Sequence, residues 1–326
     1  MRRPVLTSFL IVAASVVAFG LFVDRRADFR AAAIEAAFPP EGQFVDVGGS
    51  NIHVIVKGQG PDLVLIHGAG GNTRDLDIAI VDELSSRFRV FLVDRPGHGW
   101  SDRLGPQFER LFGNSAESPI EQAHALADAV EALGATDPIV VGHSFGGAVA
   151  MAWALERQSV ATVTIAGVLL PWPGDIDASY RLFGSRLGGA IVAPIAAAFV
   201  PESYVRGVLE GVFRPNQGPS DYYTRGGVPL ATRLETIRAN NQQVRALRPF
   251  VVDQSERYDE ITHPIEVLHG TEDKSVFLTV HAEPIAERLS NVNLTVLDGV
   301  GHSPHHVVPE QVIAAIDRAA ERAGLR

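Results

Sequence analysis

The sequence predicts an α/β protein built on a doubly wound, mostly parallel sheet, with a helical insertion and an N-terminal transmembrane helix. The first observation is a set of short apolar runs of the length typical of buried parallel strands. They occupy residues 63–66, 90–93, 139–141, 161–165, 265–268 and 294–297. The second observation is helical periodicity between several of these runs, at residues 120–133, 147–156, 280–289 and 309–323. Strands that alternate with helices form a sheet covered on both faces.

The composition excludes several classes of protein. The length of 326 residues allows one large domain or two smaller ones, and 46% hydrophobic residues suffice for a sizeable core. The formal net charge of −10 argues against a nucleic-acid-binding protein, because that function requires clustered Lys and Arg. The absence of cysteine excludes disulfides, thiolate nucleophiles and cysteine-based zinc sites. We expect no cofactor and no metal.

The N-terminus carries an uncharged apolar stretch at residues 4–23, PVLTSFLIVAASVVAFGLFV. This is the length that a helix needs to cross a bilayer. Residues 1–24 are therefore interpreted as a single-pass membrane anchor of the signal type, with the rest of the chain exported. A signal peptide cleaved after Ala18 or Gly20 is the alternative. The length of the stretch and the lack of an Ala-x-Ala site favour the anchor.

The remaining chain is interpreted as a linker, two parts of one core, and an insertion. Residues 25–43 predict a helical linker beside the membrane, and residues 44–47 and 52–56 predict a β-hairpin. The core is assigned to residues 44–170 and 260–326. Residues 171–259 contain helical segments, prolines and paired glycines but no clear strand. We interpret them as an insertion folded over the carboxyl edge of the sheet.

The stretch 139-IVVGHSFGGAVAMAWAL-155 places a serine where a buried strand turns into a helix. The pattern Gly-x-Ser-x-Gly alone is a weak signal, because glycine and serine are common. Here Gly142 and Gly146 flank Ser144 at a strand-to-helix corner, the arrangement that presents a nucleophilic serine. The helix dipole and the first N–H groups then face negative charge that develops on a substrate. A glycine-rich turn with an N-capping serine is the alternative.

A serine nucleophile needs a base that accepts its proton. His302 follows the last predicted strand, so it can reach the crevice at the carboxyl edge where Ser144 lies. His305 and His306, one turn further on, are the alternatives.

The base needs an acid that fixes its tautomer. Asp273 follows the preceding strand in 265-IEVLHGTEDKSV-276, with Glu272 beside it and Asp175 after an earlier strand as alternatives. Asp273 is favoured because it gives the chain order Ser, Asp, His that accompanies a strand–serine–helix corner.

The glycine-rich loop 66-IHGAGGNTRD-75 follows the first parallel strand. Its backbone can approach a substrate oxygen closely, so the N–H groups of Ala69 and Phe145 are the candidate oxyanion donors. A phosphate-binding loop is excluded because no Gly-Lys-Ser/Thr follows, and the spacing of a dinucleotide fingerprint is missing.

Over residues 44–322 the chain resembles the α/β-hydrolase fold superfamily. The resemblance rests on five motifs in order, 67-HGAGG-71, 94-DRPGHGWSD-102, 142-GHSFG-146, 270-GTED-273 and 299-GVGHSP-304. It implies a complete catalytic triad of Ser144, Asp273 and His302.

The resemblance also implies roles outside the triad. Residues 171–259 would be the cap, where the specificity of such proteins resides. Asp94 would shape the structure rather than take part in the chemistry. Trp100 would either line the substrate pocket or serve packing alone.

These residues predict a membrane-anchored serine hydrolase that cleaves a small, apolar carboxylic ester through an acyl-enzyme. Alternatives that keep the triad are a C–C bond hydrolase and a cofactor-free perhydrolase or haloperoxidase. Epoxide hydrolases and haloalkane dehalogenases are disfavoured, because the similar proteins with those activities carry an aspartate at the position of Ser144. A non-enzymatic binding role is disfavoured by the intact triad. The expected partners are the ester and the membrane, and no nucleic acid.

Overall fold

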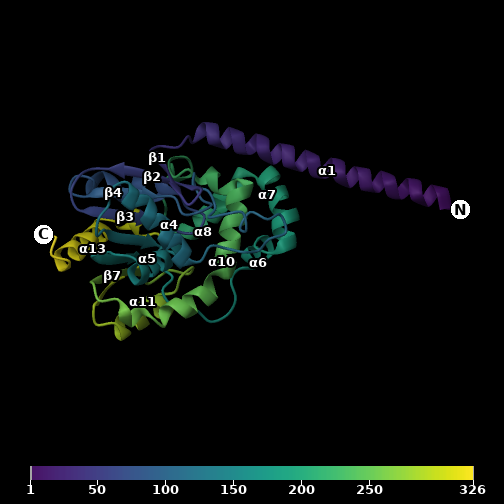
Figure 1. The fold of residues 1–326 in the computed structure, drawn as a ribbon. Coiled ribbons are helices and arrows are strands. Elements are labelled where there is room, and N and C mark those ends of the chain that lie inside the picture. Colours follow the sequence, from purple (N-terminus) through teal and green to yellow (C-terminus); the bar gives the residue numbers. More distant parts are fainter. Residues whose placement is uncertain (1, 326) are drawn as a thin grey trace.

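The computed structural model describes residues 2–325, with side chains from Thr7 onward, and contains an eight-stranded sheet (Figure 1). The strands lie in the order β1-β2-β4-β3-β5-β6-β7-β8. Their bounds are β1 Gln43–Val47, β2 Ser50–Lys57, β3 Asp62–Ile66, β4 Arg89–Val93, β5 Ile139–His143, β6 Ala161–Ile165, β7 Ile265–Gly270 and β8 Val292–Leu297. The pairs β1–β2 and β2–β4 are antiparallel, and every other pair is parallel. The predicted fold class is therefore confirmed.

All the strands predicted from the sequence are present, each within two residues of its expected bounds. One helical stretch between β3 and β4 was not predicted. It consists of α2 Thr73–Leu76, the π-helix η1 Asp77–Val81 and α3 Asp82–Leu84. The wide π turn in its middle disturbs the regular spacing of apolar residues, which is the signal that identifies a helix in a sequence.

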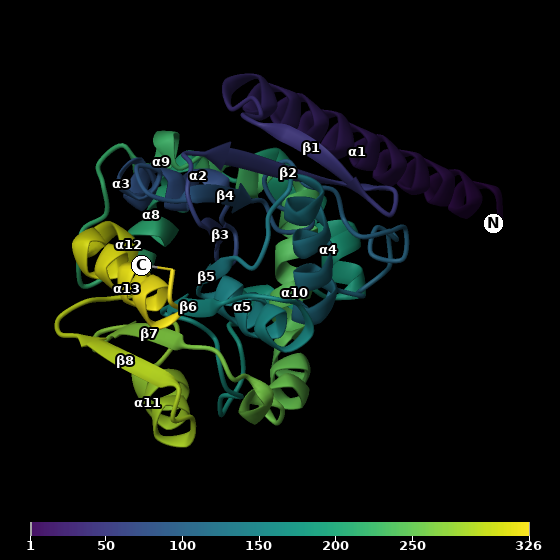
Figure 2. The same cartoon turned by 60° about the vertical axis from the view of Figure 1, so that its left-hand side comes forward.

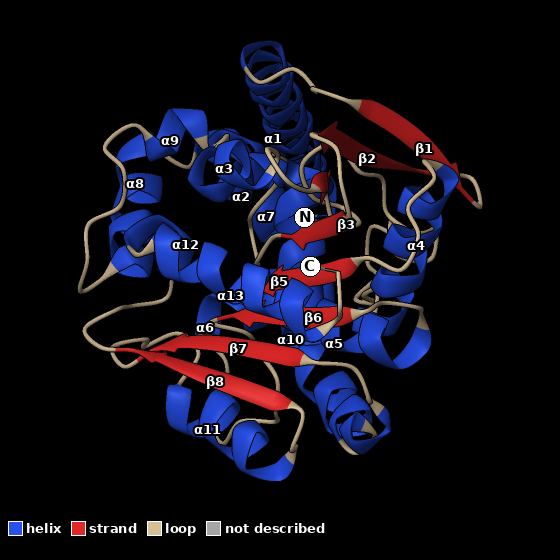
Figure 3. Ribbon diagram, turned by 90° about the vertical axis from the view of Figure 1, so that its left-hand side faces the viewer, coloured by secondary structure: helices blue, strands red, loops and turns tan. Residues whose placement is uncertain are grey.

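Helices cover both faces of the sheet (Figure 3). The core helices are α4 Pro119–Ala132, α5 Phe145–Glu156, α11 Leu278–Arg288, α12 Pro304–Val307 and α13 Pro309–Arg322. Alternate residues of β3 face opposite layers. Leu63 and Leu65 pack with residues of α13 and the β3–β4 helices, whereas Val64 and Ile66 pack with residues of α4 and α5. Both faces of the central strands are thus buried, which explains why they read as continuous apolar runs.

The strand order identifies where a site can form. The strand β3 lies between β4 and β5, so the chain reverses its direction of winding at this point. In open parallel sheets, ligands bind outside the carboxyl ends of the strands at such a reversal. Ile66 at the end of β3 is paired with Gly142 of β5, which brings the loop after β3 beside the start of α5.

Between β6 and β7 the described chain forms helices and loops but no strand, and we refer to residues 171–259 as the cap. Its helices are α6 Ala178–Phe183, η2 Gly188–Val192, α7 Ala193–Phe199, α8 Glu202–Phe213, α9 Tyr222–Arg225, η3 Val228–Thr232, α10 Leu234–Ser255 and η4 Tyr258–Glu260. The helix α10 crosses the molecule and joins the cap to the core (Figure 2), since its Leu247 and Val251 pack among the residues of α4 and α5.

The N-terminal helix α1 Arg2–Ala37 extends away from the body of the molecule (Figure 1). It includes both the apolar stretch and most of the predicted linker without a break. Its outer part is exposed and is long and apolar enough to cross a membrane. Its inner part packs on the cap, where Val23 and Ala27 are buried against Ala197 and Ala198 of α7. Arg26 Nε also donates to the carbonyl of Ala198 at 3.0 Å.

Candidate active site

The turn between β5 and α5 forces Ser144 into an unusual backbone conformation. Ser144 has φ +52° and ψ −116°, a backbone conformation that residues other than glycine rarely adopt. The two flanking positions have no room for a side chain. A Cβ on Gly142 would lie 2.1 Å from the carbonyl oxygen of Gly146, and a Cβ on Gly146 would lie 2.4 Å from that of Ile66. Glycine at both positions thus lets the chain pass through this corner without a clash.

Three side chains form a hydrogen-bonded series at the carboxyl edge. His302 Nε2 lies 2.9 Å from Ser144 Oγ, and His302 Nδ1 lies 2.7 Å from Asp273 Oδ2. The tautomer that suits both contacts donates its Nδ1–H to Asp273 and leaves Nε2 to accept the serine hydroxyl. The pairing of Gly270 in β7 with Leu297 in β8 sets the loops of Asp273 and His302 side by side.

Asp273 is held as a carboxylate. Its Oδ1 accepts hydrogen bonds from the backbone N–H groups of Ser275 and Val276, at 2.8 and 2.9 Å. Burial alone would raise the pKa of Asp273, but the contacts with His269, His302 and these N–H groups hold the pKa well below its ordinary value. His269, whose Nε2 lies 3.4 Å from Asp273 Oδ2, was not singled out from the sequence.

The alternative acids and bases lie elsewhere. Asp175 is exposed and pairs with Arg181 at 2.5 Å, while the exposed side chain of Glu272 pairs with Lys274 at 3.2 Å. The nearest carboxylate to His305 and His306 is Asp75, at 3.3 and 3.0 Å. The structure therefore brings together Ser144, Asp273 and His302, whereas the side chains of the alternatives are paired with other residues.

The loop after β3 passes close to the serine. A Cβ on Gly68 would lie 3.0 Å from Ser144 Cβ. Among the described residues, no acceptor is bonded to the N–H of Ala69, and the N–H of Phe145 is the first of α5, where no intrahelical acceptor exists. Both groups are thus free to bind an oxyanion. The next N–H in the loop, that of Gly70, donates to Asn240 Oδ1 of the cap at 2.7 Å.

Arg95 lies beneath this loop and is fully buried. Its Nε and Nη2 donate to the carbonyls of His67 and Gly68 at 3.1 and 3.0 Å, and its guanidinium stacks 4.2 Å from the Phe145 ring. Burial lowers the pKa of Arg95 to about 9. The sequence interpretation missed this residue and Asn240. The one signal that could have identified Arg95 is its position two residues after the end of a buried strand, in the loop 94-DRPGHGWSD-102.

The other residues singled out in this loop have structural partners. Asp94 is buried, lies 2.8 Å from His53 Nδ1 and accepts the backbone N–H groups of Thr73 and Trp100. The Trp100 indole donates to the carbonyl of Phe38 at 3.2 Å, and the guanidinium of Arg233 in the cap stacks on its ring. These contacts give Trp100 a packing role, and its contact with a substrate stays a prediction.

Comparisons with known proteins agree with this geometry. A model of the alpha/beta hydrolase family matches residues 63–315. The 2-(acetamidomethylene)succinate hydrolase of Mesorhizobium japonicum is 25% identical over 83% of this chain and 92% of its own length. Haloalkane dehalogenase 2 of Mycobacterium tuberculosis is 26% identical over 86% and 94% of the two chains.

One solved structure shares the fold over almost the whole chain. The crystal structure of a membrane phospholipase A superposes with a TM-score of 0.64 at 19% identity and covers 98% of this chain and 99% of its own. The relatives with these different activities show that the fold alone does not select the reaction. On the family match, the chain belongs to the alpha/beta hydrolase family and is a hydrolase enzyme.

Proposed function

We propose that the enzyme is a serine hydrolase that cleaves carboxylic esters through an acyl-enzyme intermediate. The observation that carries the proposal is the series Ser144–His302–Asp273, with contacts of 2.9 and 2.7 Å. Ser144 is the nucleophile, His302 the general base and then the general acid, and Asp273 the group that orients the imidazole. These roles require that the imidazole is hydrogen-bonded both to the serine hydroxyl and to the carboxylate.

The reaction proceeds in two halves. Ser144 Oγ attacks the ester carbonyl while His302 Nε2 takes the hydroxyl proton, and the N–H groups of Ala69 and Phe145 bind the oxyanion. The tetrahedral intermediate collapses, the C–O bond to the alcohol breaks, and His302 returns the proton to the departing alkoxide. Water then attacks the acyl-Ser144 ester with the same base, which releases the acid and restores the serine.

The buried Asp273 stabilises the imidazolium that forms in each half. Because hydrogen bonds hold the pKa of Asp273 low, the carboxylate stays ionised and does not compete for the proton. A C–C bond hydrolase or a perhydrolase would use the same residues. The first would act on a diketone-type substrate, and the second would replace water by peroxide in the second half of the reaction.

We further propose that the substrate is apolar and that α1 anchors the enzyme at a membrane, with residues 171–259 as the cap. Four exposed apolar side chains follow one another at intervals of four residues from the N-cap of η2 to the end of α7. They are Leu187, Ile191, Ile195 and Phe199, with exposed fractions of 65%, 56%, 38% and 41%. The stripe meets α1 where the rings of Phe22 and Phe199 lie 6.2 Å apart. A continuous apolar surface of this kind suits contact with lipid. A cleaved signal peptide is the alternative for α1.

A series of p-nitrophenyl esters, from acetate to laurate, tests the proposed substrate class. The full-length chain is assayed in nanodiscs, and a serine-directed fluorophosphonate first titrates the active sites. Each buried methylene contributes ~0.8 kcal/mol, so kcat/KM is expected to rise roughly fourfold per added carbon until the pocket is filled. A steady fall from acetate onward would show a small pocket, and faster formation of peracid than of acid in peroxide would favour the perhydrolase.

A further inference from the structure

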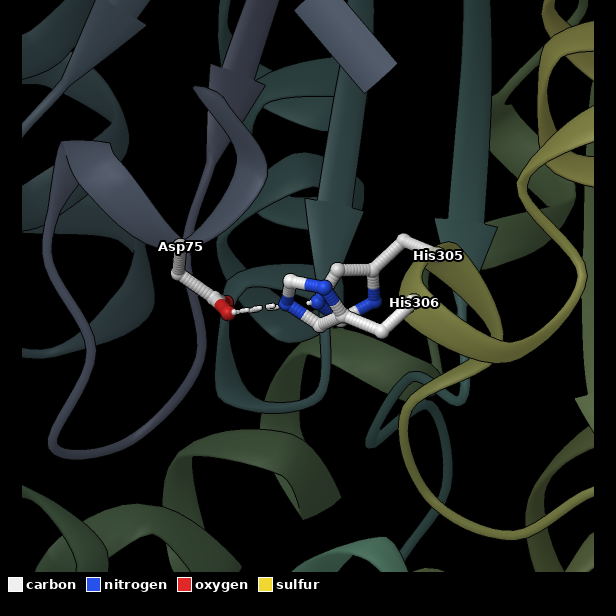
Figure 4. A group of neighbouring side chains, drawn as sticks. All are labelled: Asp75, His305 and His306. Carbon is white, nitrogen blue, oxygen red and sulfur yellow. Dashed lines mark hydrogen bonds and ion pairs between the residues drawn. The ribbon is translucent and has the colours of Figure 1, made fainter. Parts of the chain in front are cut away.

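Figure 4 shows a second group of buried titratable side chains. It lies near the triad, since the His143 ring packs against both His302 and His305, with centroids 5.1 and 4.4 Å apart. Asp75 of α2 faces His305 and His306 of α12, and the ligand atoms of these three residues lie within 4.8 Å of one another. Asp75 Oδ1 is 3.0 Å from His306 Nε2 and 3.3 Å from His305 Nε2. All three side chains are more than nine-tenths buried. No step of the ester hydrolysis described above uses them.

The distances and the donor atoms suit a metal ion. In a tetrahedral site with metal–ligand bonds of about 2.0 Å, neighbouring ligand atoms lie roughly 3.3 Å apart. Two imidazoles and a carboxylate form a set that binds zinc and the neighbouring transition metals rather than magnesium or calcium. We propose that Asp75, His305 and His306 bind one divalent transition-metal ion of the zinc type.

A fourth side chain supplies an independent observation. His143 is buried, and its Nε2 lies 2.9 Å from the carbonyl of His302, to which it donates its proton. The lone pair of its Nδ1 has no hydrogen-bond partner among the described residues. This nitrogen faces Asp75 Oδ2 across 3.9 Å. Two buried acceptors that face each other repel, and positive charge bound at Asp75 offsets that repulsion.

The surroundings of the cluster have the features of a metal site. The Tyr222 hydroxyl of α9 donates to Asp75 Oδ1 at 2.7 Å and so fixes the orientation of the carboxylate. The Phe213 ring packs edge-on against Tyr222 and His306, with ring centroids 5.0 and 5.6 Å apart, and shields the polar atoms from solvent. A bound ion would connect α2 to α12, and the Tyr222 hydroxyl would join the cap to the same carboxylate.

Calorimetric titration with zinc chloride tests the proposal. The full-length chain is purified in detergent without a polyhistidine tag, treated with a chelator and dialysed. We expect one zinc ion per chain, and visible d–d absorption when Co²⁺ takes its place. His306→Gln and Asp75→Asn are each expected to weaken binding by about 100-fold or more, since they remove a ligand. The matched control His124→Gln changes an exposed histidine of α4 and leaves binding unchanged.

A metal-free hydrogen-bond network is the alternative that the titration must exclude. The same distances suit direct donation from neutral His305 and His306 to Asp75, which needs no metal. If the unaltered chain binds neither ion stoichiometrically, or if His306→Gln binds as tightly as the unaltered chain, that metal-free network is correct and the proposal is wrong. Tyr222→Phe removes only the donor to Asp75 and is expected to weaken binding about tenfold. Tyr222→Phe still tests the proposal if the ligand variants do not fold. An unchanged zinc affinity of this variant would also contradict the proposal.

Discussion

At the carboxyl edge of the sheet, hydrogen bonds connect the reactive side chains to one another and to the backbone, whereas the outer face of the cap exposes large apolar side chains. Asp273 alone contacts two backbone N–H groups and two histidines. On the cap, Leu187 and Ile191 are more than half exposed. Buried polar groups must be satisfied by neighbours, so they fix one geometry. Exposed apolar groups do not define a single geometry, and their role depends on which molecule or surface covers them.

The comparison assigns different tasks to the two regions. Under the proposed function, the edge of the sheet would determine which bond is broken, and the cap would determine which substrates reach it. Changes at the edge should therefore abolish turnover of every substrate. Changes on the outer face of the cap should discriminate among substrates and leave the chemistry intact.

The largest effect is expected from Ser144→Ala. Because nucleophile and base act as one unit, kcat for p-nitrophenyl acetate should fall by about 10⁵-fold or more, with an unchanged melting temperature. Fluorophosphonate labelling should disappear. Labelling that persists in this variant would mean that another serine is the nucleophile.

Asp273→Asn should lower kcat on the order of 10³–10⁴-fold, because the amide does not hold His302 in the tautomer that accepts the serine proton. Glu272→Gln is the matched control and should change kcat less than twofold, since Glu272 contacts Lys274 and no member of the triad. Steady-state kinetics on one ester suffices. A larger loss in Asp175→Asn than in Asp273→Asn would place the acid after the earlier strand.

Arg95→Met should lower kcat by about 100-fold and leave KM almost unchanged, because the carbonyls of His67 and Gly68 lose the donors that orient the oxyanion loop. Arg95→Lys keeps a cation and should lose less. Arg157→Met, which breaks exposed ion pairs with Asp128 and Glu131, is the control for loss of an arginine. If Arg95→Met has a lower melting temperature but an unchanged kcat, the role of Arg95 is structural.

The smallest effect is expected on the outer face of the cap. The double variant Ile191→Ser/Ile195→Ser should retain kcat on p-nitrophenyl acetate within twofold. Its kcat/KM on laurate in nanodiscs should fall by roughly three- to tenfold, since two apolar side chains no longer contact lipid. Val252→Ser alters an apolar side chain of α10 with a similar exposed fraction to Ile195, outside the stripe. Equal losses on both esters would mean that the stripe serves the folding of the cap.

The same contrast explains how much the sequence could predict. The strands were found because the central ones are buried on both faces, and that leaves a continuous apolar signal. Ser144, Asp273 and His302 were singled out because each follows the end of a strand, so a local pattern is enough to bring them to one edge. The structure sets them in hydrogen-bonding distance.

The supporting residues could not be found in this way. Arg95 contacts Gln243, and Asn240 contacts Gly70, across 148 and 170 positions of the chain. Such contacts depend on how the cap folds back over the core, which no local spacing encodes. The cluster of Asp75, His305 and His306 also escapes any local pattern, since Asp75 lies 230 and 231 positions from the two histidines, in the other part of the core.

As the proposed membrane anchor, the continuous helix α1 would connect the bilayer rigidly to the body of the enzyme. Its 36 residues measure about 54 Å, and a bilayer core takes up about 30 Å of this length. The rest is not a flexible tether, because Val23, Ala27 and Arg26 fasten it to α7. As an anchor, such a helix confines the search for substrate to two dimensions at a fixed height. A thinner membrane would tilt the helix and turn the whole hydrolase with it.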